Sequence, residues 1–360
     1  MPVRVAIVDD SPFTCGLLAE YLAEVPDVKV IGSAHSGAAA LELVKTKRPD
    51  VLTLDVEMPD ADGVTVLRQL MREWPLPVVM VSGLSRRAAE ITHTAISEGA
   101  VDFVLKYSAG SNLDTATFAR DFAIRIREAG RQRRVKKVAT FARTCAKSRP
   151  SHVLANVATV RGKSVPVVVI GSSTGGPSAL NRLFSEWSNG LNAAVVVVQH
   201  MPAGFTKTLA LQLDRIGNIP VREAQTGDQL APGVALVTPG DWHLVIKEQG
   251  IIELTQADKV SGHRPSIDVT MKSAARVYGA GAIGVILTGM GNDGSDGLAT
   301  IHDAGGQTLA QDANSSVVFG MPQRVIERGV VKFTGPPETL GREIARLTSI
   351  KTSDLLKVKL

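Results

Sequence analysis

Short apolar runs that alternate with amphipathic segments are the feature that most restricts how this chain can fold. In residues 1–126, segments with helical spacing of their apolar residues separate runs such as VRVAIV (3–8), VLTL (51–54) and VVMV (78–81). Continuous apolar strands between amphipathic helices are typical of a parallel sheet that helices cover on both faces. We therefore predict an α/β domain in residues 1–126, with a doubly wound five-stranded parallel sheet.

Residues 164–360 show the same alternation and predict a second α/β domain with a parallel sheet. We expect its core strands in VPVVVIG (165–171), NAAVVVVQ (192–199), GVALVTPG (233–240) and AIGVILTG (282–289). The segment HLVIKEQGIIELTQ (243–256) has the pattern of an antiparallel hairpin, with its turn at Gln249 and Gly250. This hairpin would be an accessory to the parallel sheet.

Charge separates these two domains. Residues 1–126 contain 12 basic and 17 acidic side chains, and residues 164–360 contain 17 of each, whereas residues 127–163 contain 11 basic and one acidic. Nucleic-acid surfaces usually add stacking rings or a recognition helix to their charge, but this stretch has one aromatic residue, Phe141. We therefore interpret residues 127–163 as a solvated basic linker that does not bind nucleic acid. Attraction to an acidic partner is the alternative.

Composition also bears on location. The longest apolar runs, such as AAVVVV (193–198), are far shorter than the ~20 residues that span a bilayer. The first residues lack the pattern of a signal peptide. The two cysteines, Cys15 and Cys145, do not form a disulfide framework of the kind found in small secreted proteins. We expect a cytoplasmic monomer without membrane insertion.

Polar side chains follow the predicted strands of residues 1–126 at the points where the strands end. Asp9 and Asp10 follow the first strand, Asp55 the third, Ser82 the fourth and Lys106 the fifth. The carboxyl ends of parallel strands meet at one edge of the sheet. Crowded carboxylates there need a hard cation such as Mg²⁺, and a hydroxyl and a lysine bind phosphoryl oxygens. The pattern therefore predicts phosphoryl transfer to Asp55 with Mg²⁺.

The motifs VDDSP (8–12), LDVEMPDADG (54–63) and MVSG (80–83), with the final lysine, resemble the response-regulator receiver family. The resemblance implies that Asp55 accepts a phosphoryl group from a histidine kinase. It also implies a set of supporting residues: Asp9, Asp10, Asp55 and the backbone carbonyl of Glu57 for Mg²⁺, and Ser82, Lys106 and Phe103 for phosphoryl binding and switching.

A second group of polar residues lies in the second domain. Gly171, Ser172, Ser173, Thr174 and Gly175 fit the pattern G-x-S-x-G, with Ser173 at its centre. Such a stretch forms a sharp turn from strand to helix that exposes a nucleophilic serine. Glycine-rich turns after strands also bind phosphate, so the motif alone leaves both interpretations open.

Two further strand ends favour the nucleophile. His200 follows the strand predicted at 192–199, and Asp293 lies just past the strand predicted at 282–289. A serine needs a base to remove its proton, and the base needs a carboxylate to fix its tautomer. We therefore predict a Ser173, His200 and Asp293 triad. Its order along the chain differs from that of the α/β-hydrolases, in which the acid precedes the histidine.

Five motifs resemble the family of chemotaxis protein-glutamate methylesterases: STGG (173–176), QHMP (199–202), HRPS (263–266), TGMGNDG (288–294) and SSVVFGMP (315–322). The resemblance implies that Ser173 is the nucleophile, His200 the base and Asp293 the orienting acid, with the backbone amides of Thr174 and Met290 as the oxyanion hole. It implies hydrolysis of γ-methyl glutamyl esters on chemoreceptors, deamidation of receptor glutamines, and no cofactor for the esterase chemistry. It also implies inhibition by the receiver domain and its relief by phosphorylation.

Two other functions remain as alternatives at this point. One is a response regulator with a DNA-binding output, although no short helix-turn-helix domain follows the basic segment. The other is a non-catalytic signalling scaffold, against which all three triad residues argue. We interpret His263 as a structural or surface residue, since it shows no metal-ligand spacing. Arg264 could orient a substrate carboxylate, but packing at a helix end explains it equally well.

Overall fold

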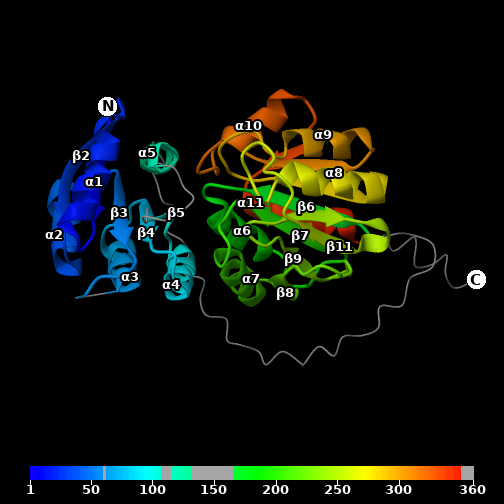
Figure 1. Cartoon of the computed structure of the whole chain (residues 1–360), viewed down its shortest axis with the longest axis horizontal. Helices are drawn as coiled ribbons and strands as arrows, with labels where there is room; N and C mark the ends of the chain where they lie inside the picture. The colour runs from blue at the N-terminus through cyan, green and yellow to red at the C-terminus, as the bar shows by residue number, and fades with distance from the viewer. Residues whose placement is uncertain (60–61, 107–114, 132–164, 350–360) are drawn as a thin grey trace, which may run out of the picture. The chain divides into compact units, whose positions relative to one another are not determined.

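The computed structural model describes residues 1–59, 62–106, 115–131 and 165–349 (Figure 1). The chain divides into two compact units, Met1–Leu154 and Ala155–Leu360, and each is described by itself. The last helix of the first unit continues past the predicted domain end at residue 126, to Arg131. The rest of the linker predicted at 127–163 lies outside the described residues.

The first unit is a five-stranded sheet in the order β2-β1-β3-β4-β5, and every pairing is parallel. This confirms the predicted doubly wound fold. Strands β3 and β4 are buried along their whole length, as expected of strands with helices on both faces. The elements are β1 (Val3–Val8), α1 (Pro12–Ala23), β2 (Val28–Ala34), α2 (Gly37–Lys47), β3 (Val51–Asp55), α3 (Gly63–Glu73), β4 (Val78–Ser82), α4 (Arg86–Ser97), β5 (Asp102–Leu105) and α5 (Thr115–Arg131).

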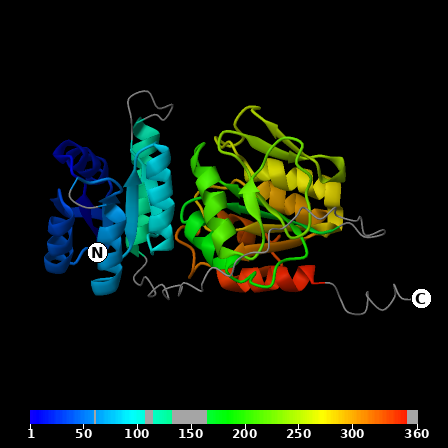
Figure 2. The same ribbon diagram turned by 90° about the horizontal axis from the view of Figure 1, so that it is seen from below.

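Helix starts in this unit follow from hydroxyl and carboxylate caps. The Ser11 side chain accepts a hydrogen bond from the Thr14 amide at the start of α1, and Asp62 caps α3 in the same way. Helix α1 packs against α5, where the rings of Phe118 and Phe122 stack with centroids 6.0 Å apart. Figure 2 shows these helices beside the sheet. The caps thus fix where each helix leaves the edge of the sheet that carries the acidic residues.

The second unit is a seven-stranded parallel sheet in the order β14-β13-β12-β6-β7-β9-β8. It confirms the predicted second parallel sheet, although β8, β13 and β14 were not among the predicted strands. The elements are β6 (Val167–Ser172), α6 (Gly176–Phe184), β7 (Ala194–Gln199), α7 (Phe205–Ile216), β8 (Val221–Glu223), β9 (Ala235–Val237), β10 (His243–Ile246), β11 (Ile252–Thr255), α8 (Ile267–Tyr278), β12 (Ala282–Ile286), α9 (Ser295–Asp303), β13 (Gln307–Gln311), α10 (Gly320–Glu327), β14 (Phe333–Gly335) and α11 (Pro337–Thr348), with the short 3₁₀ helices Glu248–Gly250 and Gly279–Gly281.

The accessory hairpin is present as predicted. Strands β10 and β11 pair antiparallel, from His243 opposite Thr255 to Ile246 opposite Ile252. The turn between them contains Gln249 with a φ of 60°, a left-handed conformation that favours glycine or asparagine. Strand β10 also packs against α8, and this contact matters for the candidate site.

Two groups of helices cover the second sheet. Helix α9 packs against α8 and α10, and helix α6 packs against α7 and α11 (Figure 1). Trp187 anchors α11, because its buried indole Nε1 donates a hydrogen bond to the Gly341 carbonyl at 3.0 Å. Its ring also packs on Phe184, with centroids 4.6 Å apart. None of the helices in the described part of the chain is long and apolar enough to cross a membrane.

Packing of α9 on β12 leads to a first prediction. A Cβ on Gly284 would lie 2.5 Å from Leu298 Cδ1 and 2.9 Å from Ile301 Cδ1, whereas one on Gly217 would meet nothing closer than 3.4 Å. Gly284→Ala should therefore lower the free energy of unfolding by about 1–3 kcal/mol through overpacking. Gly217→Ala is the matched control and should change it by less than about 1 kcal/mol. Calorimetric unfolding of both variants measures the difference, and equal stability would contradict this account of the packing.

Candidate functional site

Ser173 lies at the turn between β6 and α6. Its amide donates to the Thr288 carbonyl at 3.0 Å, and its own carbonyl accepts from the Gly176 amide at 2.8 Å. Gly175 has a φ of 74°, and a Cβ there would lie 2.4 Å from Val317. A glycine is therefore required at this position for both its backbone angle and its packing. The turn that carries Ser173 is fixed by the loop after β12.

The structure separates the two neighbouring serines. Ser172 is fully buried, and its hydroxyl donates to Gln199 Oε1 at 2.7 Å. Gln199 in turn donates from Nε2 to the Ser173 carbonyl at 2.9 Å. Ser173 retains 7% exposure at the end of the sheet. The hydroxyl of Ser172 is thus used to brace the turn, whereas Ser173 retains some exposure there.

His200 and Asp293 lie together, as the sequence predicts. His200 Nε2 is 2.8 Å from Asp293 Oδ2, and the His200 amide donates to the Ser172 carbonyl at 3.1 Å. His200 Nδ1 is buried and has no hydrogen-bond partner in the described structure. When Nε2 carries the proton that Asp293 accepts, Nδ1 holds a free lone pair. The histidine is therefore arranged to take a proton through Nδ1.

Asp293 belongs to the loop before α9, and its carboxylate binds the N-terminus of α8. Its Oδ2 accepts from the Ile267 amide at 2.7 Å, and its Oδ1 accepts from the Asp268 amide at 3.1 Å and from the Ser266 hydroxyl at 2.8 Å. Burial alone raises the pKa of Asp293, but the hydrogen bond and charge of His200 and the two amides lower that pKa to about 2. The carboxylate therefore stays ionised and holds the His200 tautomer.

The backbone amides of Thr174 and Met290 lie in the two loops that flank Ser173. The Thr288 hydroxyl donates to the Thr174 carbonyl at 2.9 Å, which ties these loops together. Gly289 donates to the Val318 carbonyl at 3.0 Å and so holds the loop that contains Met290. Neither the Thr174 nor the Met290 amide has a protein acceptor among the described residues. Both are therefore free to bind an oxyanion.

The structure brings one further histidine to the site. The rings of His200 and His263 stack, with centroids 3.9 Å apart and planes 4° apart. No sequence pattern indicates this contact, since a histidine in a loop has no periodicity to place it. Arg264, by contrast, is held by Asp241 at 2.7 Å and by backbone carbonyls of the loop after β11.

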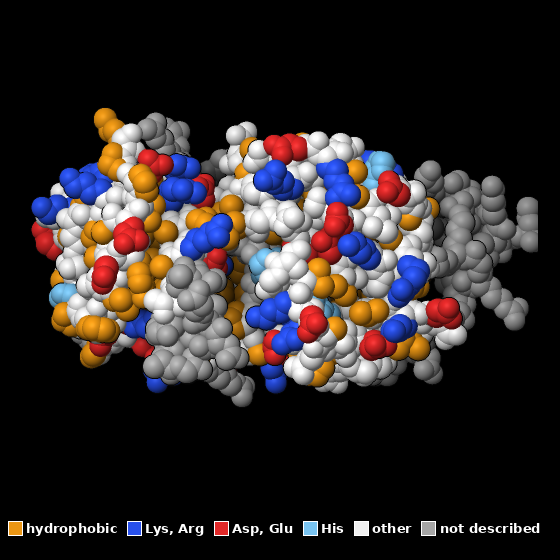
Figure 3. All heavy atoms as spheres, turned by 45° about the horizontal axis from the view of Figure 1, so that its top comes forward, with side chains coloured by type: hydrophobic (Ala, Val, Ile, Leu, Met, Phe, Trp, Pro, Cys, Tyr) orange, Lys and Arg blue, Asp and Glu red, His pale blue; other side chains and the backbone are white. Residues whose placement is uncertain are grey.

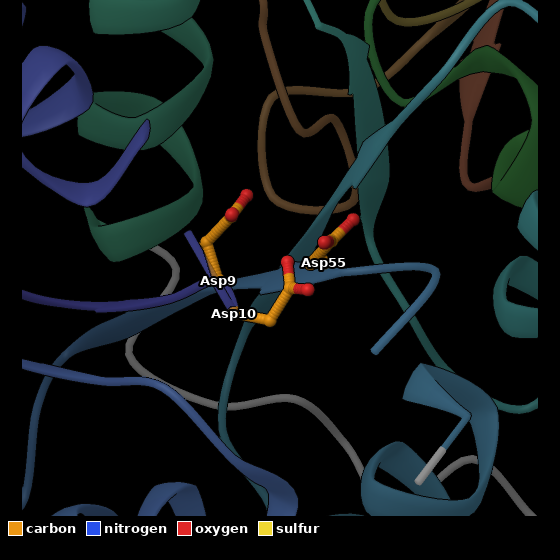
Figure 4. A group of neighbouring side chains, drawn as sticks. All are labelled: Asp9, Asp10 and Asp55. Atoms are coloured by element: carbon orange, nitrogen blue, oxygen red, sulfur yellow. The ribbon is translucent and has the colours of Figure 1, made fainter. Parts of the chain in front are cut away.

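The carboxylates predicted in the first unit also converge. Oxygen atoms of Asp9, Asp10 and Asp55 all lie within 4.8 Å of one another at the ends of the neighbouring strands β1 and β3 (Figure 4). Lys106 Nζ is 2.9 Å from Asp9 Oδ2 and 2.8 Å from Asp55 Oδ2. An all-oxygen cluster of this kind fits Mg²⁺, and the lysine balances part of its charge.

Burial governs the ionisation of this cluster. Desolvation raises the pKa of Asp55, against the opposing hydrogen bond and charge of Lys106. Burial works to lower the pKa of Lys106, but its hydrogen bonds to Asp55 and Asp9 outweigh this effect and raise it. Lys106 therefore remains a cation beside Asp55. A buried acceptor with a fixed cation next to it is the environment that a phosphoryl group needs.

The remaining predicted residues lie around Asp55. Ser82 is fully buried at the end of β4, and its hydroxyl accepts from Thr92 of α4 at 2.8 Å. The Phe103 ring lies against His93, with centroids 6.4 Å apart. Glu57 is exposed, and its amide donates to Asp55 Oδ1 at 3.4 Å. Ser82 and Glu57 therefore lie at the edge of the sheet that carries Asp55, whereas Phe103 lies further inside the sheet, opposite Met80.

Comparisons with known proteins identify both domains. Residues 168–344 match the family described as CheB methylesterase, and residues 5–118 match the response regulator receiver domain. A relative from Symbiobacterium thermophilum named protein-glutamate methylesterase/protein-glutamine glutaminase is 42% identical, covering 96% of this chain and 97% of that protein. One of the same name from Pyrococcus abyssi is 38% identical, covering 96% of this chain and 93% of its own length.

A solved structure is similar to the second unit alone. It is the Thermotoga maritima CheB methylesterase catalytic domain, with a TM-score of 0.50 and 42% sequence identity. The similarity covers 51% of this chain and 99% of that domain. The similarity thus extends over the unit that contains Ser173, His200 and Asp293.

The low pKa of Asp293 leads to a prediction about acid stability. Because the folded pKa, about 2, lies below the ordinary value of 3.8, ionised Asp293 stabilises the fold above pH ~4, and this contribution is lost as the pH falls through 2. The difference corresponds to about 2 kcal/mol. Asp293→Asn should remove this part of the pH dependence of unfolding, measured by denaturant titration from pH 6 to 2. Asp303→Asn, an exposed control, should leave it unchanged; equal slopes in wild type and Asp293→Asn would contradict the assignment.

Proposed function

This chain belongs to the family of protein-glutamate methylesterases/protein-glutamine glutaminases, in which a receiver domain precedes the esterase domain, and we propose that Ser173, His200 and Asp293 are its catalytic residues. The observation that carries this proposal is the buried, unpartnered Nδ1 of His200, whose other nitrogen is bound to Asp293 at 2.8 Å. With Nε2 bound to Asp293, this nitrogen has a lone pair available for the serine proton.

The first half of the reaction forms an acyl enzyme. The Ser173 hydroxyl loses its proton to His200 Nδ1 while its oxygen attacks the carbonyl carbon of a glutamyl methyl ester. Amides of Thr174 and Met290 bind the oxyanion that develops on the carbonyl oxygen. The bond from carbon to the methoxy oxygen then breaks, and methanol leaves with the proton returned by His200.

Water completes the cycle. His200 Nδ1 removes a proton from water as its oxygen attacks the glutamyl ester of Ser173. The bond from that carbon to the Ser173 oxygen breaks, and the proton goes back to the serine. Glutamine enters the same sequence with ammonia as the leaving group, which accounts for a glutaminase activity from one site. Asp293 stabilises the positive charge on His200 in both halves of the reaction. The esterase chemistry needs no cofactor.

The receiver unit supplies the regulatory input. The Asp9, Asp10 and Asp55 carboxylates, with the Glu57 carbonyl, would hold Mg²⁺, which supplies positive charge to the phosphoryl oxygens. A carboxylate oxygen of Asp55 attacks the phosphorus of a phosphohistidine on a kinase, and the phosphorus–nitrogen bond breaks. Lys106 and the hydroxyl of Ser82 then bind the transferred group, and Phe103 responds as the aromatic switch.

Phosphorylation of Asp55 raises the rate of the esterase unit by relieving inhibition by the receiver. Support for this comes from the presence of both matched domains in one chain. The substrates are methylated chemoreceptors, and the phosphoryl donor is a chemotaxis histidine kinase. The protein works in the cytoplasm as a monomer, without nucleic acid and without a cofactor in the esterase unit.

The mixed surface charge of the second unit is more typical of a protein that binds proteins than of one that binds DNA. On the face shown in Figure 3, basic and acidic side chains are interspersed over the second unit. This matches the equal numbers of basic and acidic residues, 17 of each, in 164–360. A DNA-binding output would need a basic surface. The names of the relatives support the hydrolase and not this alternative or a non-catalytic scaffold.

Substitution of the two neighbouring serines tests the assignment. Ser173→Ala should reduce methanol release from methylated receptor membranes by at least about 10³-fold, because the nucleophile is lost. Ser172→Ala keeps the nucleophile and loses only the hydrogen bond to Gln199, so its activity should fall by no more than about 10-fold. Substantial activity in Ser173→Ala would refute the triad.

Removal of one acidic side chain tests the metal site. Asp10 is exposed, so Asp10→Asn should leave the fold intact while it lowers Mg²⁺ affinity by at least about tenfold, because a charged ligand is lost. Asp27→Asn is the control, since Asp27 lies in the same unit and pairs with Arg131 at 3.2 Å. Calorimetric titration with Mg²⁺ measures both variants. Unchanged affinity in Asp10→Asn would rule out the cluster as the metal site.

A further inference from the structure

The contact between His200 and His263 is a feature that the triad does not explain. The two imidazoles lie face to face, 3.9 Å apart and within 4° of parallel. Asp293 contacts the Nε2 edge of His200, and His263 covers one face of the same ring. We propose that His263 is a positioning residue, which fixes the plane of the His200 ring and so the direction of its unpartnered Nδ1. This inference rests on the proposed function.

Two backbone hydrogen bonds to Val260 fix the backbone position of His263. Its amide donates to the Val260 carbonyl at 2.9 Å, and its carbonyl accepts from the Val260 amide at 3.1 Å. Between them, Ser261 and Gly262 adopt positive φ angles of 52° and 80°, which close a tight turn. The backbone that carries the His263 ring therefore has little freedom to move.

The residues after His263 tie the same segment to the catalytic acid. Arg264 binds Asp241 through Nε at 2.9 Å and through a terminal nitrogen at 2.7 Å. Ser266, two residues further on, donates its hydroxyl to Asp293 Oδ1 at 2.8 Å. His263 and Ser266, the donor to Asp293, thus lie three positions apart in one segment of the chain. This segment contacts the face of the His200 ring through His263 and binds the carboxylate of Asp293 through Ser266.

The base needs this second constraint. Its only hydrogen bond from the ring is the one to Asp293, since Nδ1 has no protein partner in the described structure. One hydrogen bond fixes a position but leaves the ring free to tilt about it. A tilt moves the Nδ1 lone pair away from the serine hydroxyl, and small displacements of this kind slow proton transfer strongly. A parallel ring in van der Waals contact prevents the tilt.

The stacked ring also suits the charged form of the base. His200 becomes an imidazolium each time it takes a proton from Ser173 or from water. The π face of a neutral aromatic ring attracts a cation placed over it. Phenylalanine provides a flat face of similar size without a titratable group, so it serves as the conservative replacement for His263.

The proposal predicts a separation between kcat and KM. In the full-length protein, His263→Ala should lower kcat for methanol release by about 10- to 100-fold and leave KM within about twofold, since the base is misplaced and the substrate is not. His263→Phe should restore kcat to within about threefold of wild type, whereas His263→Leu, which fills the space without a flat ring, should not. His302→Ala is the matched control, because His302 is an exposed histidine on α9 that pairs with Asp303, and its kcat should be unchanged.

Each result bears on one claim. Wild-type kcat in His263→Ala, or equal losses in the Phe and Leu variants, overturns the role of His263 while a dead Ser173→Ala variant still supports the triad. A large rise in KM with unchanged kcat also overturns it, since it assigns His263 to substrate binding. Activity in Ser173→Ala would instead remove the proposed function itself. Should His263→Ala fail to fold, the comparison of the Phe and Leu variants decides the question alone.

Discussion

The binding of the Asp293 carboxylate at the start of α8 is the interaction on which the arrangement of the candidate site depends. Two amides and one hydroxyl of that helix end bind the carboxylate. The hydrogen bond and charge of His200, together with the two amides, keep it ionised in a buried place. Without these partners, burial would raise the pKa of the Asp293 carboxyl group, and its protonated form would bind His200 less strongly. Because α8 also packs against β10, the accessory hairpin supports the helix that supplies these donors. The small antiparallel sheet thus has a structural reason to be present.

The two units have the same arrangement of polar residues at a sheet edge, but the residues suit different chemistry. In each, a parallel sheet brings polar residues from separate strands to its carboxyl edge. The first unit gathers negative charge there and offsets it with Lys106, which suits an incoming phosphoryl group. The second binds the Asp293 carboxylate through two backbone amides and the Ser266 hydroxyl and pairs it with His200, which suits attack on an uncharged ester. The partner of the carboxylate, a lysine in one unit and a histidine in the other, therefore distinguishes the two sites.

The sequence predicted what depends on strand ends. Asp55 follows an apolar run in the first unit whose length and composition indicate a buried parallel strand. Ser173, His200 and Asp293 follow such runs in the second, so the topology of each sheet places these residues at its own carboxyl edge. The sequence did not predict individual side-chain contacts. The hydrogen bond from Ser172 to Gln199 depends on the register between β6 and β7, and the stacking of His263 on His200 depends on how a loop closes, and no sequence pattern indicates either. Strands β13 and β14 were also missed, since QTLAQ mixes polar and apolar residues and β14 has only three residues.

The hydroxyl of Ser82 has a single proton to give. In the structure its oxygen lies 2.8 Å from the Thr92 hydroxyl, 3.2 Å from the Gly83 carbonyl and 3.5 Å from the Ala88 carbonyl. The Thr92 hydroxyl itself lies 2.6 Å from the Ala88 carbonyl. Under the proposed function, a phosphoryl oxygen on Asp55 would compete with these neighbours for the Ser82 proton. Phosphorylation would then change the hydrogen-bond partner of Ser82 beside α4.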